Sequence, residues 1–229
     1  ETAATPAEAV TLSTKNSSNS TLQFTDGISG AIGNYITTSN SSHSLLSNLS
    51  NAFAKDTDVT LAVTGTLTDS TDVAKVNVLL NASNHGAVSG AFSGTSTNAK
   101  NLSSTTNALT LTISDAVNFA DADTIRQKTT GTVTYSGEVV DSFANFFSGG
   151  NIQANSDAVV SKDSTVQYKV GSISNGSFTA ETIAVNAGNI TKVNALISSL
   201  NANNNTGVLV AKFGAGTSVG DFANLSGTG

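Results

Sequence analysis

Four short segments that alternate apolar and polar residues recur along this chain, and each opens with a threonine. They read TLQFTD from Thr21, TLAVTG from Thr60, TLTISD from Thr110 and TVQYKV from Thr165. Strict alternation is the period of a strand with one buried face. Because the pattern returns at loosely regular intervals, we predict a chain built from repeated modules that each contain a strand.

A second period, of three to four residues, lies between these strands. The segments DVAKVNVLLNAS from Asp72 and ITKVNALISSLNA from Ile190 place apolar residues at the spacing of one helical face. SLLSNLSNAFA from Ser44 and DADTIRQKTTG from Asp121 carry weaker versions of the same spacing. A glycine precedes the strand-like segments AVSGAF, TVTYSG and VLVAKF, where it can end a helix in the left-handed conformation. Each module therefore combines strand, helix and strand.

We expect an α+β fold of imperfect strand–helix–strand repeats, stacked into one elongated, β-rich unit. The repeats are predicted over residues 21–59, 60–109, 110–164 and 165–229. We favour one continuous array over two independent domains. The weakest part of the array is predicted at 151–164, where the segment NIQANSDAVVSKDS loses the helical pattern.

Residues 1–20 are predicted to form an extended leader without a helix. The stretch AVTLSTKNSSNSTLQFTDG, which begins in this leader, is rich in Thr and Ser and has strand propensity. One interpretation is a strand exchanged with a neighbouring subunit, whose sheet it completes through backbone hydrogen bonds. The alternatives are an ordinary first strand or an unstructured tail.

Composition excludes several classes of protein. Charged residues make up 11% of the chain, the net charge is −6 and Arg126 is the single arginine, so we expect no nucleic-acid partner. Cysteine is absent, which excludes disulfides and thiolate metal sites. No apolar run approaches the roughly 18 residues of a membrane span. The opening ETAATPAEAV is similar to the end left by signal-peptide cleavage, so we expect a secreted protein, at the cell surface or extracellular.

Two segments, TTGTVTYSGEVVDSFANF and NTGVLVAKFGAGTSVGDFANL, share a Thr-Gly step, an alternating strand and an apolar-spaced tail. In this style the chain resembles the Thr/Asn/Ala-rich repeat modules of large secreted bacterial surface proteins of the cyanobacterial type, which are S-layer-like or adhesin-like. The resemblance covers most of residues 60–229. It implies an exported structural or adhesive role, and it implies no ligand and no active site.

Short Asp-x-Asp steps are the candidate metal sites, because calcium takes about six to eight oxygen ligands from carboxylates, amides and turns. The candidate calcium ligands are Asp56 and Asp58 in KDTDV, and Asp121 and Asp123 in ADADT with Asp115 nearby. The alternative is helix capping. Asp72 and Asp123 each precede a helical segment, and aspartate is a favoured N-cap residue.

Catalytic motifs are missing. His43 in NSSHSLL and His85 in ASNHGAV fit turn positions, and no nucleophile, zinc or phosphate-loop motif accompanies them, so we expect no enzymatic activity. A group of phenylalanines has the spacing of a buried helical turn. Its members are Phe143, Phe146, Phe147 and Phe222.

Together these features predict a non-enzymatic structural subunit of an extracellular assembly, either a surface layer, a fibre or a filament. Its partners would be copies of itself, joined through strand edges and apolar faces. The alternative is an adhesin or a phage surface module that binds a host glycan or receptor.

Overall fold

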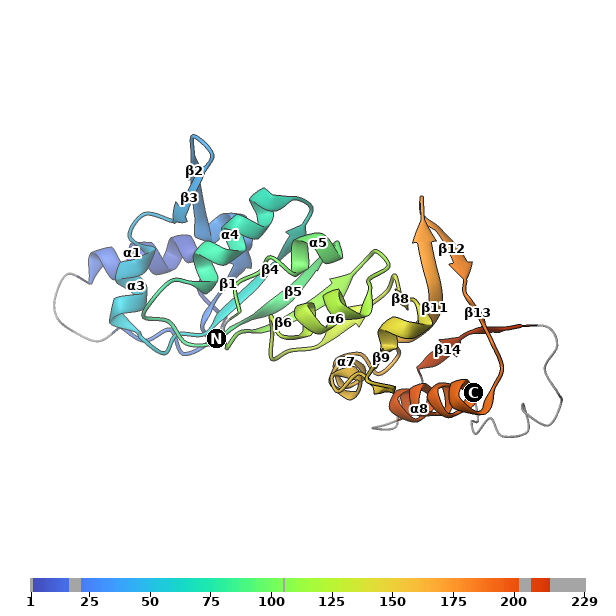
Figure 1. The fold of residues 1–229 in the computed structure, drawn as a ribbon. Helices are drawn as coiled ribbons and strands as arrows, with labels where there is room; N and C mark the ends of the chain where they lie inside the picture. The colour runs from blue at the N-terminus through green and yellow to red at the C-terminus, as the bar shows by residue number, and fades with distance from the viewer. Residues whose placement is uncertain (1, 17–21, 105, 202–206, 215–229) are drawn as a thin grey trace. The chain divides into compact units, whose positions relative to one another are not determined.

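The computed structural model describes residues 2–16, 22–104, 106–201 and 207–214, which divide into two compact units (Figure 1). Unit 1 comprises Glu1–Thr112 and Gln127–Thr132, and unit 2 comprises Ile113–Arg126 and Val133–Gly229. Helices and strands alternate in both units, and the central sheets contain parallel pairs, so the expected mixture of helix and strand is confirmed. The division into two units differs from the single array that we expected.

Unit 1 is organised around a sheet whose strands follow the order β1-β4-β5-β6. The β1–β4 and β4–β5 pairs are parallel, with Ile28 opposite Leu61 and Leu61 opposite Val88. Strand β4 alternates as predicted, because Leu61 and Val63 are buried and Ala62 and Thr64 are exposed. The elements of unit 1 are α1 (Pro6–Lys15), β1 (Ile28–Ala31), α2 (Ile32–Tyr35), β2 (Ile36–Ser39), β3 (Ser42–Leu45), α3 (Leu49–Lys55), β4 (Leu61–Leu67), α4 (Ser70–Leu80), β5 (Val88–Gly94), α5 (Ser96–Ala99) and β6 (Ala108–Ile113), the last of which continues into unit 2.

Helix α4 forms where the helical period predicts it. Its apolar positions Val73, Val76, Leu79 and Leu80 are all buried. The N-cap is Asp69, whose side chain accepts hydrogen bonds from two backbone N–H groups at 2.8 and 3.0 Å. The N-cap prediction for Asp72 is therefore wrong, because the helix begins two residues before it.

The prediction of an extended leader is wrong for Pro6–Lys15, which forms helix α1. Thr5 and Glu8 form a capping box: the Glu8 N–H donates to Thr5 Oγ1 at 3.3 Å, and the Thr5 N–H donates to Glu8 Oε2 at 2.8 Å. Ala9 is fully buried. A helix does not present the extended row of backbone groups that strand exchange requires, so Pro6–Lys15 does not serve as an exchanged strand. Residues 17–21 lie outside the described residues, and Leu22 to Asp26 form no strand, contrary to the TLQFTD prediction.

Unit 2 places β11 between β8 and β14, and both pairs are parallel. The far end of β11 turns back as an antiparallel hairpin with β12 (Figure 1). The elements of unit 2 are α6 (Phe119–Arg126), β7 (Val133–Tyr135), β8 (Val139–Asp141), the 3-10 helix η1 (Phe143–Phe146), β9 (Phe147–Ser148), β10 (Asn151–Ile152), α7 (Ser156–Lys162), β11 (Gln167–Ser174), β12 (Ser177–Ala180), β13 (Thr182–Ile183), α8 (Ala187–Asn201), β14 (Val208–Val210) and β15 (Lys212–Phe213).

The helical predictions for unit 2 have mixed outcomes. Helix α8 buries Val193, Leu196 and Leu200, as its spacing predicts, while Ile197, expected on the same face, is half-buried. Helix α7 lies inside the stretch 151–164, which we expected to lose helical structure. At seven residues, α7 makes only about two turns, so its apolar spacing is hard to recognise in the sequence. It contributes Val159 and Val160 to the core. In the phenylalanine group, Phe143 and Phe146 are buried, Phe147 is half-buried, and Phe222 lies outside the described residues.

The two units repeat one succession of elements. The series α1, β1, α2, β2, β3, α3, β4, α4 and β5 of unit 1 corresponds to α6, β8, η1, β9, β10, α7, β11, α8 and β14 of unit 2, which has β7 after α6 and β12 and β13 after β11 in addition. Pairing agrees as well: Ile28 lies opposite Leu61 in unit 1, and Val139 lies opposite Tyr168 in unit 2. A single residue before the first helix forms an isolated parallel bridge to β1 or β8, Ala4 in unit 1 and Val117 in unit 2.

The two units fill corresponding places in their cores with different side chains. In unit 1 the fully buried Tyr35 donates its hydroxyl to Ile28 O at 2.7 Å, and Leu61 stands on the adjacent strand. In unit 2 Phe146 takes the place of Tyr35, and Tyr168 takes the place of Leu61, with the two rings 5.2 Å apart.

None of the helices in the described part of the chain combines the length and the apolar character that a bilayer crossing needs.

Candidate functional site

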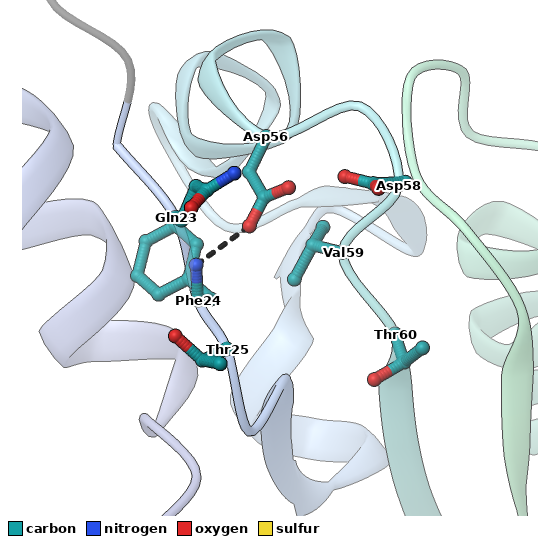
Figure 2. A pocket seen from close by; sticks show the side chains of 7 residues that line it. All are labelled: Gln23, Phe24, Thr25, Asp56, Asp58, Val59 and Thr60. Carbon is teal, nitrogen blue, oxygen red and sulfur yellow. Dashed lines mark hydrogen bonds between the residues drawn. The ribbon is translucent and has the colours of Figure 1, made fainter.

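The pocket that brings predicted site residues together lies in unit 1, where the chain segment before β1 passes the loop after α3 (Figure 2). Its volume is about 190 Å³. Two of the predicted calcium ligands face it, the buried Asp56 and the exposed Asp58. The residues that line the pocket are Gln23, Phe24, Thr25, Asp56, Asp58, Val59 and Thr60.

Asp56 is held in place by its own hydrogen bonds. It is the C-cap residue of α3, and its backbone N–H donates to Ala52 O. Its side chain, in a residue that is only 7% exposed, accepts the backbone N–H of Phe24 at 2.6 Å, as Figure 2 shows. Burial raises the pKa of the Asp56 carboxyl above its ordinary value, and the Asp58 carboxyl beside it raises this pKa further, while the Phe24 N–H acts in the opposite direction.

Unit 2 contains the same contact between a buried C-cap aspartate and a backbone N–H distant in sequence, but the residue next to the aspartate differs. Asp163 is the C-cap residue of α7 and accepts the backbone N–H of Tyr135 at 2.7 Å. Where unit 1 has Asp58, unit 2 has Thr165, whose N–H and hydroxyl both donate to Asp163 at 2.9 and 2.8 Å. The buried aspartate is therefore part of the shared framework, and the second carboxylate at Asp58 is the feature peculiar to the pocket of unit 1.

The other predicted ligands do not converge on one point. Asp121 and Asp123 lie two residues apart on helix α6, so their side chains leave the helix in nearly opposite directions. The Asp121 carboxylate accepts a hydrogen bond from the side-chain amide of Asn118 at 3.2 Å. Asp123 pairs with Arg126 at 2.6 Å and receives the amide of Asn155 at 2.8 Å. Asp115, outside that helix, also has interactions of its own.

Asp123 is a residue inside α6, so the prediction that it caps a helix is wrong. The capping contact comes from Asn118, whose side chain accepts the Asp121 N–H at 2.8 Å. Across the described residues no group of three or more His, Asp or Glu side chains is arranged to hold a metal ion. The pocket of unit 1 offers two carboxylates with threonine and glutamine oxygens around them.

The two histidines lie on different elements. His43 is on β3 and its Nδ1 lies 3.0 Å from Thr38 Oγ1. His85 follows α4, with Nδ1 2.7 Å from Gly86 O and its ring edge-on to Phe53. Among the described residues, the hydrogen-bond partners of the two rings are a threonine hydroxyl and a backbone carbonyl, and neither is a carboxylate that could orient a general base.

A wider hollow of about 470 Å³ lies between α1 and α3 in unit 1. Small polar side chains dominate its lining, and it contains no aromatic residue. Its lining residues are Ser13, Thr14, Asn16, Asn48, Asn51, Ala54 and Lys55. Sequence reasoning missed this hollow, because it depends on α1 packing beside α3, and α1 was not expected.

Replacement of Asp56 by asparagine is expected to keep or increase the stability of unit 1 at pH 7. The raised pKa means that the folded state binds the Asp56 proton more tightly than the unfolded state. The stability that this proton contributes is complete below the ordinary value of 3.8 and is lost as pH rises through the raised value. Asp56→Asn should remove this loss, which urea unfolding between pH 3 and about 7 measures.

Asp58→Asn is the matched control, because it removes the like charge and leaves the buried carboxyl in place. The pH dependence of its free energy of unfolding should lie between that of the wild type and that of Asp56→Asn. A wild-type unit 1 that gains more stability than Asp56→Asn on going from acid to neutral pH would contradict the assignment.

Comparison with known proteins adds no assignment to this geometry: no protein-family model, no curated protein and no solved structure matches the chain.

Proposed function

We propose that this chain is a non-enzymatic structural subunit of a secreted, extracellular assembly, and that it acts by associating with copies of itself. The observation that carries the proposal is the repetition of one framework in two units, down to the buried aspartate after α3 and after α7. A chain that repeats a framework and varies its surface is typical of building units. The described pockets contain groups that hold the fold together, chiefly Asp56.

Self-association would use strand edges and apolar surface. Large apolar side chains are exposed at Ile173 on the β11–β12 hairpin (41%) and at Val208 on β14 (47%). Low charge density, 11% of residues, favours close packing of like surfaces. Stable interfaces of this kind bury on the order of 2,000 Å² or more.

The repeat division belongs to the same proposal. The predicted modules 21–59 and 60–109 together span nearly the sequence of unit 1, and the modules 110–164 and 165–229 span nearly that of unit 2. We propose that further copies of this framework stack into an elongated assembly of the surface-layer, fibre or filament type. In this proposal calcium binds at Asp58, whose exposed carboxylate faces the pocket of unit 1.

The test is electron microscopy of the purified chain over a concentration series, with calcium and with EDTA, alongside analytical sedimentation. We expect ordered sheets or filaments. Assemblies that dissolve in EDTA and persist in Asp56→Asn but not in Asp58→Asn would place the calcium contribution at Asp58. Assemblies that survive EDTA would remove calcium from the proposal. A chain that stays monodisperse under every condition would overturn self-association.

The second candidate is an adhesin or a phage surface module that binds a host glycan or receptor. The hollow between α1 and α3 favours it, because its amide and hydroxyl groups can bond sugar hydroxyls. A glycan array probed with the wild type and with Asn51→Ala, which changes the lining of the hollow, tests this function. Saturable binding that Asn51→Ala removes, by a chain that does not assemble, would favour the adhesin.

A further inference from the structure

The last strand of the shared framework has different neighbours in the two units. In unit 1, β5 pairs with β4 on one side and with β6 on the other. In unit 2, the corresponding strand β14 pairs with β11, and no other described strand lies beside it. The correspondence follows from register, because Leu61 lies opposite Val88 and Tyr168 lies opposite Leu209.

The hydrogen-bond pattern shows which backbone groups of β14 point outward. In unit 1 the Leu61 N–H donates to Ala87 O at 2.9 Å, so Ala87 turns its carbonyl toward β4. Successive residues of a strand turn their backbone groups to opposite sides, so Val88 presents its groups to the side of β6. Val208 and Leu209 hold the places of Ala87 and Val88. Leu209 therefore presents its N–H and C=O on the side of β14 that faces away from β11.

The open edge of β14 is also apolar. Val208 is 47% exposed, and Leu209 is half-buried, whereas Val88 at the corresponding place in unit 1 is 4% exposed. An apolar strand with unpaired backbone groups is a template for another strand, and proteins usually cover or charge such edges. The next charged residue along the chain is Lys212, on β15.

Unit 1 shows what covers this edge. Residues 108–112 of β6 lie beside β5, with Leu109 and Leu111 buried and Ala108 and Thr110 exposed. The covering strand is thus short, uncharged and alternates leucine with small or hydroxyl residues. Thr110 presents its backbone groups toward β5, because Leu111 donates its N–H on the opposite side, to Thr132 O at 3.0 Å.

We propose that the edge of β14 that no described strand covers is a docking site for a strand of the β6 type, presented by a further copy of this same framework. The inference rests on the proposed self-association and names the surface that performs it. The incoming strand extends the sheet of unit 2 as β6 extends that of unit 1, by main-chain hydrogen bonds to Leu209 and by packing its leucines beside the Leu209 side chain, which holds the place of the buried Val88.

The experiment uses the full chain and a fluorescein-labelled peptide of residues 106–114, TNALTLTIS. We expect saturable binding by fluorescence anisotropy, with a Kd of about 1–100 μM, because one short strand supplies a few hydrogen bonds and little area. The same peptide with proline in place of its Thr110 is the peptide control. It lacks the N–H that would face β14 and should bind at least about tenfold more weakly.

The matched protein variants separate backbone from side chain. Leu209→Pro removes the outward N–H, which edge strands tolerate, and should weaken peptide binding at least about tenfold. Leu209→Ala keeps that N–H and removes the side chain, so it reports the packing contribution and should weaken binding less than Leu209→Pro. Circular dichroism confirms that each variant is folded before binding is measured.

Three outcomes would overturn the docking site: no saturable binding of the peptide, equal binding of the proline-containing peptide, or Leu209→Pro binding as well as the wild type. The last outcome would mean that the peptide binds elsewhere. Failure of the docking site is distinguishable from failure of the proposed function. Assemblies that form equally with wild type and Leu209→Pro retain self-association and reject this edge, whereas a monomeric chain that binds the peptide at Leu209 retains the edge and rejects self-association.

Discussion

Replacing Gly90 with alanine should destabilise unit 1 by about 4 kcal/mol or more, a loss at the upper end for single substitutions. Gly90 adopts φ +140°, which L-residues with a side chain rarely adopt, and a Cβ at this place would lie 1.6 Å from Val63 O. The pairing of β4 with β5 runs through Ala62–Ser89 and resumes at Gly65–Phe92, so the contact lies in the middle of the sheet. The backbone has to move for alanine to fit.

Gly33→Ala is the matched control, since Gly33 lies in α2 with no atom within 4 Å of a Cβ. It should be neutral or stabilising by up to about 1 kcal/mol, because alanine loses less entropy in a helix than glycine. The chain has no tryptophan, so amide hydrogen exchange followed by mass spectrometry is the suitable measurement. Unchanged protection of β4 and β5 in Gly90→Ala would refute the close approach at Val63.

Asp163→Ala is expected to destabilise unit 2 by about 3 kcal/mol, because it leaves buried donors without an acceptor. Asp163 is 6% exposed and accepts the N–H of Tyr135, itself 3% exposed, at 2.7 Å. It also accepts both donors of Thr165. Because Asp163 and Tyr135 are both buried, a water molecule could accept the Tyr135 N–H in place of the carboxylate only if β7 and α7 moved apart.

Asp163→Asn separates charge from shape. Its carbonyl oxygen can replace one of the two carboxylate oxygens, whereas its amide nitrogen accepts no hydrogen bond, so the loss should be smaller than for Asp163→Ala. Asp26→Ala, which removes an exposed aspartate, should change stability by less than about 0.5 kcal/mol. Urea unfolding of the three variants checks the order. A loss for Asp163→Ala no larger than that for Asp26→Ala would contradict the role of Asp163 in the framework.

The sequence predicted the long periodic elements of the fold well. Helices α4 and α8 are long enough to repeat the helical spacing, so the sequence indicated which face of each is buried. Strand β4 likewise shows its alternation over several residues. These patterns survive because each reflects a single buried face, which local sequence alone determines.

Helix α1 was missed although its signal is present. Thr5, Pro6 and Glu8 are the N-cap, N1 and N3 residues of a capping box, a pattern readable without a structure. The Ser- and Thr-rich composition that follows outweighed it. Helix α7 had a weaker signal, because the residue three places after Asn155 is Ala158 and not the Glu or Gln of a capping box.

The candidate site was predicted in part, and for a different reason than the one the structure gives. Asp56 and Asp58 were identified as neighbours in sequence, and they do face one pocket. The role of Asp56 depends on Phe24, which is distant in sequence, and no local pattern encodes that contact. The correspondence of the units was hidden because the hexads from Thr60 and Thr165 are offset by two residues from the structural match of Leu61 with Tyr168.

The β11–β12 hairpin makes unit 2 different in outline from unit 1, although the two share a framework. It is inserted before α8, and nothing similar separates β4 from α4 in unit 1. In an ordered array in which both units occupy equivalent places, the shared framework would diffract strongly at half the subunit spacing. The hairpin would supply the weaker reflection at the full spacing. The intensity ratio of these two orders would then measure how far the two halves have diverged in shape.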